Sequence, residues 1–108
     1  MTKRKLQVLD CTIRDGGYYT NWDFEKSLVL KYLTAISSAK IDIVEIGFRF
    51  MPQNKFLGPY GYSSDDLLKT LPLPNNVKFA VMINASDLIN YKDGIDEAVK
   101  LLFSEKKN

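Results

Sequence analysis

Three short apolar runs at even spacing constrain the fold of this chain more than any other feature. Residues 6–13, 41–48 and 77–83 are rich in Val, Ile, Leu and Phe, which is the composition and length of β-strands. The centres of the runs lie about 36 residues apart, a suitable length for one β/α unit of a parallel sheet. No sequence identity accompanies this spacing, so it reflects architecture rather than a repeated sequence.

A stretch with helical periodicity follows the first run. Four apolar residues at helical spacing form one stripe there: Val29, Tyr32, Leu33 and Ile36. We expect Asp23 to cap this helix and Glu25 to lie in its first turn, where the helix dipole favours an acidic side chain.

Two further helices are expected later in the chain. The first covers about residues 64–71, where Ser63 and Asp66 resemble a capping box. The second covers about residues 95–103, and its apolar face is formed by Ala98, Leu101 and Leu102.

The alternation of strand and helix predicts an α/β protein with parallel strands. Eight such units would approach the typical TIM-barrel length of about 250 residues. We therefore interpret residues 1–108 as the first three β/α units of a (β/α)8 barrel, and as an incomplete domain. In a barrel, the irregular segment 51–62 is a loop on the face where active sites form. An incomplete barrel exposes unpaired strand edges, so we expect self-association, with residues 77–83 as the exposed edge.

Composition excludes several classes of protein. The net charge of +2, with Lys and Arg scattered along the chain, does not favour a nucleic-acid-binding protein. No apolar run approaches the roughly 18 residues of a membrane span, and no secretory leader is recognisable. The single cysteine, Cys11, is compatible with a reducing cytoplasm. The chain has no histidine, so histidine-based chemistry must come from residues outside it.

The segment that closes the first run carries the strongest local signal for chemistry. There a cation, Arg14, and a carboxylate, Asp15, stand side by side before Gly16 and Gly17. If the strand continues to residue 14, alternation places Asp10, Thr12 and Arg14 on one face and Leu9, Cys11 and Ile13 on the other. Arg14 would then lie at the rim of a barrel where catalysis occurs.

The second run contains a carboxylate, Glu45, within apolar sequence. Alternation places Ile43, Glu45, Gly47 and Arg49 on one face and Val44, Ile46 and Phe48 on the other. A buried carboxylate needs a partner, and Arg14 on the adjacent strand is the expected one. Such a pair either fixes a guanidinium that stabilises an enolate or carboxylate, or is a structural ion pair.

These residues also carry a family resemblance. Residues 10–18 (DCTIRDGGY) and 21–24 (NWDF) resemble the opening of the HMG-CoA-lyase-like, or pyruvate carboxyltransferase-like, TIM barrels, which include the 4-hydroxy-2-oxovalerate aldolases. Residues 44–48 (VEIGF) resemble the second strand of those barrels. The resemblance covers the whole chain as an N-terminal third.

The resemblance implies a divalent-metal-dependent aldolase or lyase that makes or breaks a carbon–carbon bond next to a 2-oxo acid or acyl enolate. It implies that Arg14 stabilises the enolate, that Asp15 ligates Mg²⁺ or Mn²⁺, and that Glu45 sits beside the arginine. The other metal ligands of the family include a His-x-His pair on a late strand, outside this chain. Tyr18 stands where the bacterial oxovalerate aldolases have a histidine, and it is the candidate for proton transfer, although tyrosine is a poorer base near neutral pH.

Other readings remain open at this point. A non-catalytic α/β module that binds a ligand or partner would need a complete sheet within the chain. A dinucleotide-binding domain is disfavoured, because no G-x-G-x-x-G follows the first run.

Overall fold

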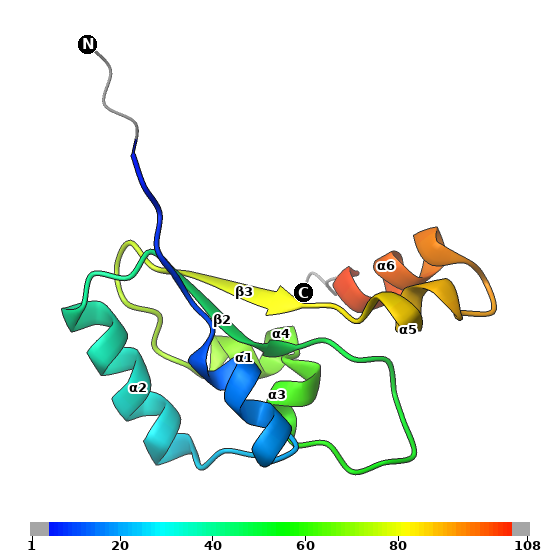
Figure 1. Ribbon diagram of the computed structural model, residues 1–108, viewed down its shortest axis with the longest axis horizontal. Helices are drawn as coiled ribbons and strands as arrows, with labels where there is room; N and C mark the ends of the chain where they lie inside the picture. The colour runs from blue at the N-terminus through cyan, green and yellow to red at the C-terminus, as the bar shows by residue number, and fades with distance from the viewer. Residues whose placement is uncertain (1–4, 105–108) are drawn as a thin grey trace.

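The computed structural model describes residues 5–104 and contains one parallel sheet with helices between its strands (Figure 1). The strands are β1 (Leu9–Asp10), β2 (Ile43–Phe48) and β3 (Lys78–Met82), in the order β1-β2-β3. Both neighbouring pairs are parallel. The predicted α/β class with three parallel strands is therefore confirmed.

The first strand is much shorter than predicted. After β1, the chain turns at once into helix α1 (Thr12–Gly16) and the 3₁₀ helix η1 (Gly17–Tyr19). The backbone amide of Thr12 donates to the Asp10 carboxylate at 2.9 Å, and the Asp15 amide donates to the Cys11 carbonyl at 2.9 Å. These local bonds compete with the strand ladder. The prediction that Asp10, Thr12 and Arg14 share one strand face is therefore wrong.

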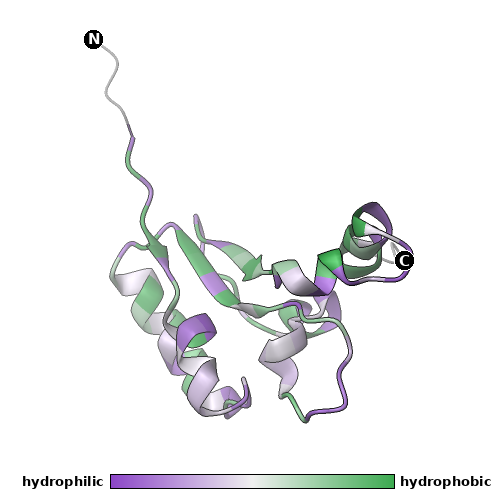
Figure 2. Cartoon of the chain, turned by 45° about the vertical axis from the view of Figure 1, so that its right-hand side comes forward, coloured by the Kyte–Doolittle hydropathy of each residue, from purple (hydrophilic) through white to green (hydrophobic). Residues whose placement is uncertain are grey.

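Helix α2 (Lys26–Ser38) follows and covers one face of the sheet. Its apolar stripe is confirmed, because Val29, Leu33 and Ile36 are all buried in the core. The predicted start is wrong, since the helix begins later. Glu25 occupies the N-cap position and makes no side-chain capping bond. Figure 2 shows the alternation of apolar and polar residues along this helix and the strands.

Strand β2 lies at the centre of the sheet, and its register against β3 shifts between Glu45 and Gly47. An irregularity of this kind inserts one residue and reverses the alternation of faces beyond it. Phe48, predicted on the face opposite Glu45, lies beneath Arg14. Arg49, predicted on the Glu45 face, packs instead against α4. The strict two-residue alternation predicted for this run therefore fails after Glu45.

Two short helices connect β2 to β3. The segment 51–62 is irregular until α3 (Pro59–Tyr62), and α4 (Asp65–Lys69) comes next. The cap of α4 is one residue later than predicted, because Ser64 accepts a hydrogen bond from the Leu67 amide at 3.1 Å. Ser63 is fully buried in a left-handed conformation and donates to the Tyr60 carbonyl instead.

Helices α5 (Ala85–Ile89) and α6 (Ile95–Phe103) lie beyond the carboxyl end of β3 (Figure 1). The bounds of α6 agree with the prediction, and α5 was not predicted. Only Ala98 of α6 is buried, and apolar residues of this helix remain on the surface: Ile95, Val99, Leu101 and Phe103. None of the helices within residues 5–104 is long and apolar enough to cross a membrane.

Candidate active site

An arginine that follows β1 and a glutamate in the middle of β2 meet beside the sheet. The Nε of Arg14 donates to Oε1 of Glu45 at 2.5 Å, which joins α1 to β2. Their side chains are 19% and 12% exposed, so both groups are largely withdrawn from water. The predicted Arg14–Glu45 pair is confirmed, although a helical turn rather than a strand presents the arginine.

The Arg14 guanidinium is hydrogen-bonded through Nε alone among the described residues. Within residues 5–104 its side chain hydrogen-bonds to Glu45 alone, and no buried polar side-chain atom lacks a partner. Its Nη1 lies 3.7 Å from the Asp15 carboxylate. The hydrogen bond to Glu45 raises the pKa of Arg14 above its already high ordinary value. The result is a permanently charged, oriented cation whose terminal nitrogens can take an anionic ligand.

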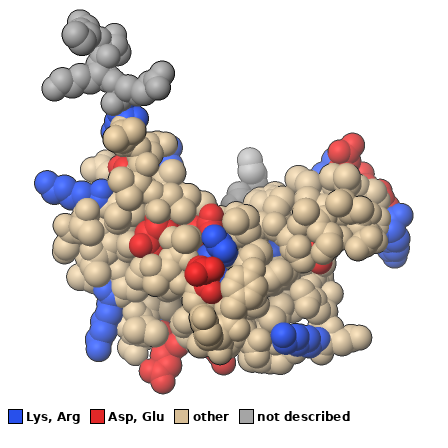
Figure 3. Space-filling view, viewed as in Figure 1, with Lys and Arg blue, Asp and Glu red and all other residues tan. Residues whose placement is uncertain are grey.

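Asp15 is the exposed member of the site. Its side chain is 71% exposed beside the guanidinium. Figure 3 shows basic and acidic surface side by side at the position of α1. In the described part of the chain, no group of three or more His, Cys, Asp or Glu side chains could hold a metal ion. Asp15 can thus offer one oxygen ligand to a hard divalent cation, and other ligands would have to complete the site.

Tyr18 lies one turn after Arg14, and both contact Phe48. The Tyr18 ring is edge-on to Phe48 at 6.0 Å between centroids, and the Arg14 Cζ lies 5.9 Å from the Phe48 centroid. Tyr18 is 60% exposed. The η1 turn therefore presents a phenol on the same side as the guanidinium.

Tyr18 belongs to an aromatic cluster that sequence reasoning did not find. The cluster consists of Tyr18, Trp22, Phe48 and Phe50. Trp22 is 5% exposed, and its Nε1 donates to the Arg14 carbonyl at 2.8 Å. The sequence feature that matches this packing is Gly17. In the structure, a Cβ at that position would lie 1.9 Å from Cδ1 of the indole.

A second missed contact fixes the end of β1. The Tyr32 hydroxyl of α2 donates to the Asp10 carboxylate, which also accepts the Thr12 amide. Burial opposes the charge of Asp10, but these hydrogen bonds outweigh it and hold its pKa below 3.8. Burial, together with the bond to Asp10, raises the pKa of Tyr32 far above its usual value. Tyr32 was predicted only as part of the apolar stripe, and its hydroxyl ties α2 to the start of the α1 turn.

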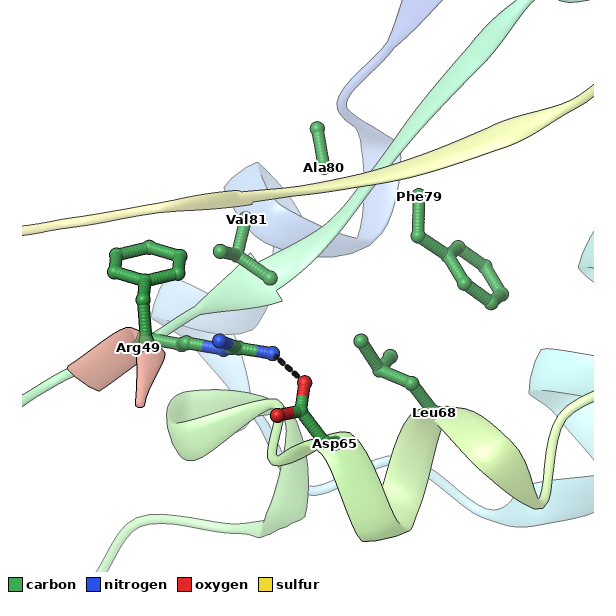
Figure 4. Close-up of a pocket in the computed structure, with 7 residues that line it drawn as sticks. Arg49, Asp65, Leu68, Phe79, Ala80 and Val81 are labelled. Atoms are coloured by element: carbon green, nitrogen blue, oxygen red, sulfur yellow. Dashed lines mark hydrogen bonds and ion pairs between the residues drawn. The ribbon is translucent and has the colours of Figure 1, made fainter. Parts of the chain in front are cut away.

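A pocket lies elsewhere, between β3, α4 and α6 (Figure 4). It has a volume of about 540 Å³ and is lined by Arg49, Asp65 and apolar residues. All three nitrogens of Arg49 have acceptors: Nε donates to the Ser63 carbonyl, Nη1 to the Leu102 carbonyl and Nη2 to Asp65. This arginine holds elements together and has little left to bind a ligand.

The comparisons with known proteins give one informative result. The sequence matches no protein-family model, and no curated protein matches it. Over 92% of its length the chain is similar to a solved structure described as the N-terminal domain of a putative aldolase from Bacteroides vulgatus. The identity is 37% and the TM-score is 0.79. The chain spans 31% of that protein chain.

The chain is therefore a parallel α/β unit that resembles the N-terminal domain of a putative aldolase. Three of the predicted site residues, Arg14, Asp15 and Tyr18, come from the consecutive helices α1 and η1, and Glu45 joins them from β2.

Proposed function

We propose that residues 10–48 form the first part of the active site of a divalent-metal-dependent aldolase or lyase of the HMG-CoA-lyase-like kind. The reaction makes or breaks a carbon–carbon bond next to a 2-oxo acid or acyl enolate. One observation carries the proposal. The Arg14 guanidinium is fixed at Nε by Glu45, its terminal nitrogens make no hydrogen bond among residues 5–104, and its Nη1 lies beside the exposed carboxylate of Asp15.

Each residue has a distinct role in this proposal. Breaking the bond leaves negative charge on an enolate oxygen, and the preoriented Arg14 stabilises that charge. Glu45 keeps the guanidinium in place and never touches the substrate. Tyr18, exposed on the same side, holds the proton that moves to or from the substrate hydroxyl.

The described residues supply only part of the ligand set that a divalent metal needs. Asp15 supplies one carboxylate of the kind that Mg²⁺ and Mn²⁺ prefer, and residues outside this chain would supply the others. When bound, the ion acts as a Lewis acid toward the oxygens of a 2-oxo acid. We expect this chemistry in a reducing cytoplasm, where the half-buried Cys11 stays a thiol.

The test is a metal titration of the protein that carries this chain, with a 4-hydroxy-2-oxo acid as substrate and release of pyruvate as the readout. The parent should respond to Mn²⁺, and Asp15→Asn should not. Tyr18→Phe should bind the substrate as before but turn over more slowly. Asp15→Asn turnover equal to the parent's, at every Mn²⁺ concentration, would exclude the metal role. A parent that releases no pyruvate at any Mn²⁺ concentration would instead favour the non-catalytic ligand-binding module.

We also propose that the 108-residue chain by itself associates through its β3 side. Strand β3 pairs only with β2 among the described residues, and apolar side chains of α6 lie exposed nearby. An unpaired strand edge next to apolar surface favours contact with another strand. Light scattering should show a dimer or larger assembly, and Val81→Lys should shift it toward the monomer. A stable monomer of the unchanged chain would contradict this.

A further inference from the structure

Trp22 sits in a backbone turn that side-chain-bearing residues rarely adopt. Asn21 and Trp22 have φ angles of 56° and 58°, two consecutive residues in the left-handed region. Such a conformation persists only when the surrounding contacts fix it, and it is concentrated at functional sites.

The indole side of Trp22 is fitted to the turn that carries Arg14. It occupies the space where Gly17 lacks a side chain, since a Cβ there would lie 1.9 Å from the ring. Its N–H donates to the Arg14 carbonyl at 2.8 Å. Gly17 itself has an ordinary φ of −61°. The glycine is therefore needed for the indole and not for the backbone.

The backbone of the same turn is held by the segment before α3. The Asn21 carbonyl accepts the Gly58 amide at 2.8 Å, and the Trp22 carbonyl accepts the Tyr60 amide at 3.1 Å. Gly58 also lets the two segments approach, because a Cβ there would lie 2.4 Å from the Asp23 Cα. Backbone hydrogen bonds from Gly58 and Tyr60 thus hold the left-handed turn in place. The indole of Trp22 in turn holds α1 through its bond to the Arg14 carbonyl.

Helix α1 needs such support. It has five residues and its N-cap makes no side-chain bond, and helices this short are not stable by themselves. The guanidinium of Arg14 has one hydrogen-bonded anchor within residues 5–104, Glu45. A single Nε bond fixes one point of the group and leaves its direction to the backbone.

We propose that Trp22 is a positioning residue for Arg14. Its indole N–H fixes the Arg14 backbone, so that the guanidinium keeps its contact with Glu45 and points its terminal nitrogens at the substrate. The inference deepens the proposed function, and it rests on that function for the claim that the terminal nitrogens of Arg14 face a substrate. The geometric part, that Trp22 orders the guanidinium, can be tested without any enzyme activity.

The experiment compares three variants of the full 108-residue chain by ¹H–¹⁵N NMR. Trp22→Phe keeps an aromatic ring and removes the N–H donor. Gly17→Ala keeps the indole and displaces it with a methyl group. Ile36→Val, a buried change in α2, is the control that lowers stability without touching the Arg14 turn. The readout is the solvent exchange rate of the Arg14 Nε–H, which is slow while the bond to Glu45 is kept.

Exchange should accelerate by about tenfold in Trp22→Phe, which corresponds to the loss of one ordering hydrogen bond. Gly17→Ala should act in the same direction, and the double variant should be no worse than the single ones, because the smaller phenyl ring leaves room for the methyl group. Ile36→Val should leave the rate unchanged. If all variants shift the rate only in proportion to their loss of stability, Trp22 is a core residue and the inference is wrong.

A second measurement separates this inference from the proposed function. Oxalate, a planar dianion shaped like the enolate of a 2-oxo acid, is titrated while the indole N–H resonance of Trp22 is followed. Trp22 is the single tryptophan of the 108 residues, so its signal needs no assignment. A shift that saturates and is lost in Arg14→Lys supports both proposals. If oxalate gives no shift while the exchange rates behave as expected, anion binding by Arg14 in this chain is excluded and the positioning role stands.

Discussion

Two arginines, each set just after or near the end of a strand, show how differently the same side chain is used in this molecule. Arg14 donates once, to Glu45, and keeps its terminal nitrogens without a hydrogen bond in the described part of the chain. Arg49 donates from all three nitrogens to three separate segments and lies beneath the Phe103 ring, 5.0 Å from its centroid. Arg49 is 7% exposed.

The difference teaches that the number of guanidinium nitrogens already bonded, and not burial or charge alone, separates an arginine that can bind a ligand from one that holds the structure together. Both cations are paired with a carboxylate. Among the described residues, only Arg14 has guanidinium nitrogens that make no hydrogen bond, and its Nη1 lies beside an exposed second carboxylate. A pocket lies at Arg49, but the chemistry points to Arg14.

Arg49→Met should cause the largest loss of stability. It leaves the Ser63 and Leu102 carbonyls and Asp65 without their donor, and Asp65 is only 30% exposed. We expect the free energy of unfolding to fall by about 2–4 kcal/mol, measured by urea denaturation. Lys100→Met is the matched control, because the Lys100–Glu97 pair is exposed and should contribute within about 0.5 kcal/mol. Equal effects of the two changes would remove the structural role of Arg49.

Tyr32→Phe should cost less and should depend on pH. The folded pKa of Asp10 is lowered, so its contribution is complete above the unfolded value of 3.8 and is lost as the pH falls through the folded pKa. Removing the hydroxyl raises the pKa of Asp10 and should cost about 1 kcal/mol at pH 7.

Urea denaturation at several pH values tests this second prediction. The difference between the parent and Tyr32→Phe should narrow as the pH is lowered below 3.8. Tyr60→Phe is the control: the pKa of Tyr60 is raised by burial and not by a carboxylate partner. A gap that stays constant from neutral to acidic pH would show that Tyr32 acts through packing alone.

Arg14→Lys should lower stability by no more than about 1 kcal/mol, because lysine keeps the charge next to Glu45. Its effect on binding should be large, since a lysine cannot reproduce the planar fork that an oxyanion needs. Oxalate titration checks this, with Arg49→Lys as the control that should retain binding. If Arg49→Lys loses oxalate and Arg14→Lys keeps it, the roles assigned to the two arginines are reversed.

Asp15→Asn should have the smallest effect on the fold. The side chain is 71% exposed and its contact with Arg14 is 3.7 Å long, so stability should change by less than about 0.5 kcal/mol. Thermal unfolding without metal measures this. A drop as large as that of Arg49→Met would place Asp15 among the structural residues.

Much of this architecture could be predicted because it depends on local sequence periodicity. The parallel order of three strands, the stripe of α2 and the bounds of α6 follow from apolar spacing. The Arg14–Glu45 pair was predicted because a carboxylate within an apolar run needs a cationic partner. The prediction succeeded although the strand argument behind it failed, because α1 leads Arg14 to the same edge of the sheet.

The rest was decided by contacts between distant residues. Asp10 turns the chain at Thr12 through hydrogen bonds to Thr12 and to Tyr32 of α2, and no local pattern distinguishes that tyrosine from a core residue. The register shift in β2 sends Arg49 to Asp65. The indole of Trp22 reaches the Arg14 carbonyl across eight residues of sequence.

The sequence by itself determined the class of the fold, the positions of the main elements and the pairing of one buried carboxylate with one cation. It could do so because hydrophobic burial and charge neutralisation are strong and act residue by residue. Only the tertiary structure decided which arginine keeps terminal nitrogens without a hydrogen bond among the described residues. It also decided where β1 ends and what supports the turn that carries Arg14. These outcomes depend on which hydrogen-bond partners the completed packing brings within about 3 Å, and that competition has no signature in spacing or composition.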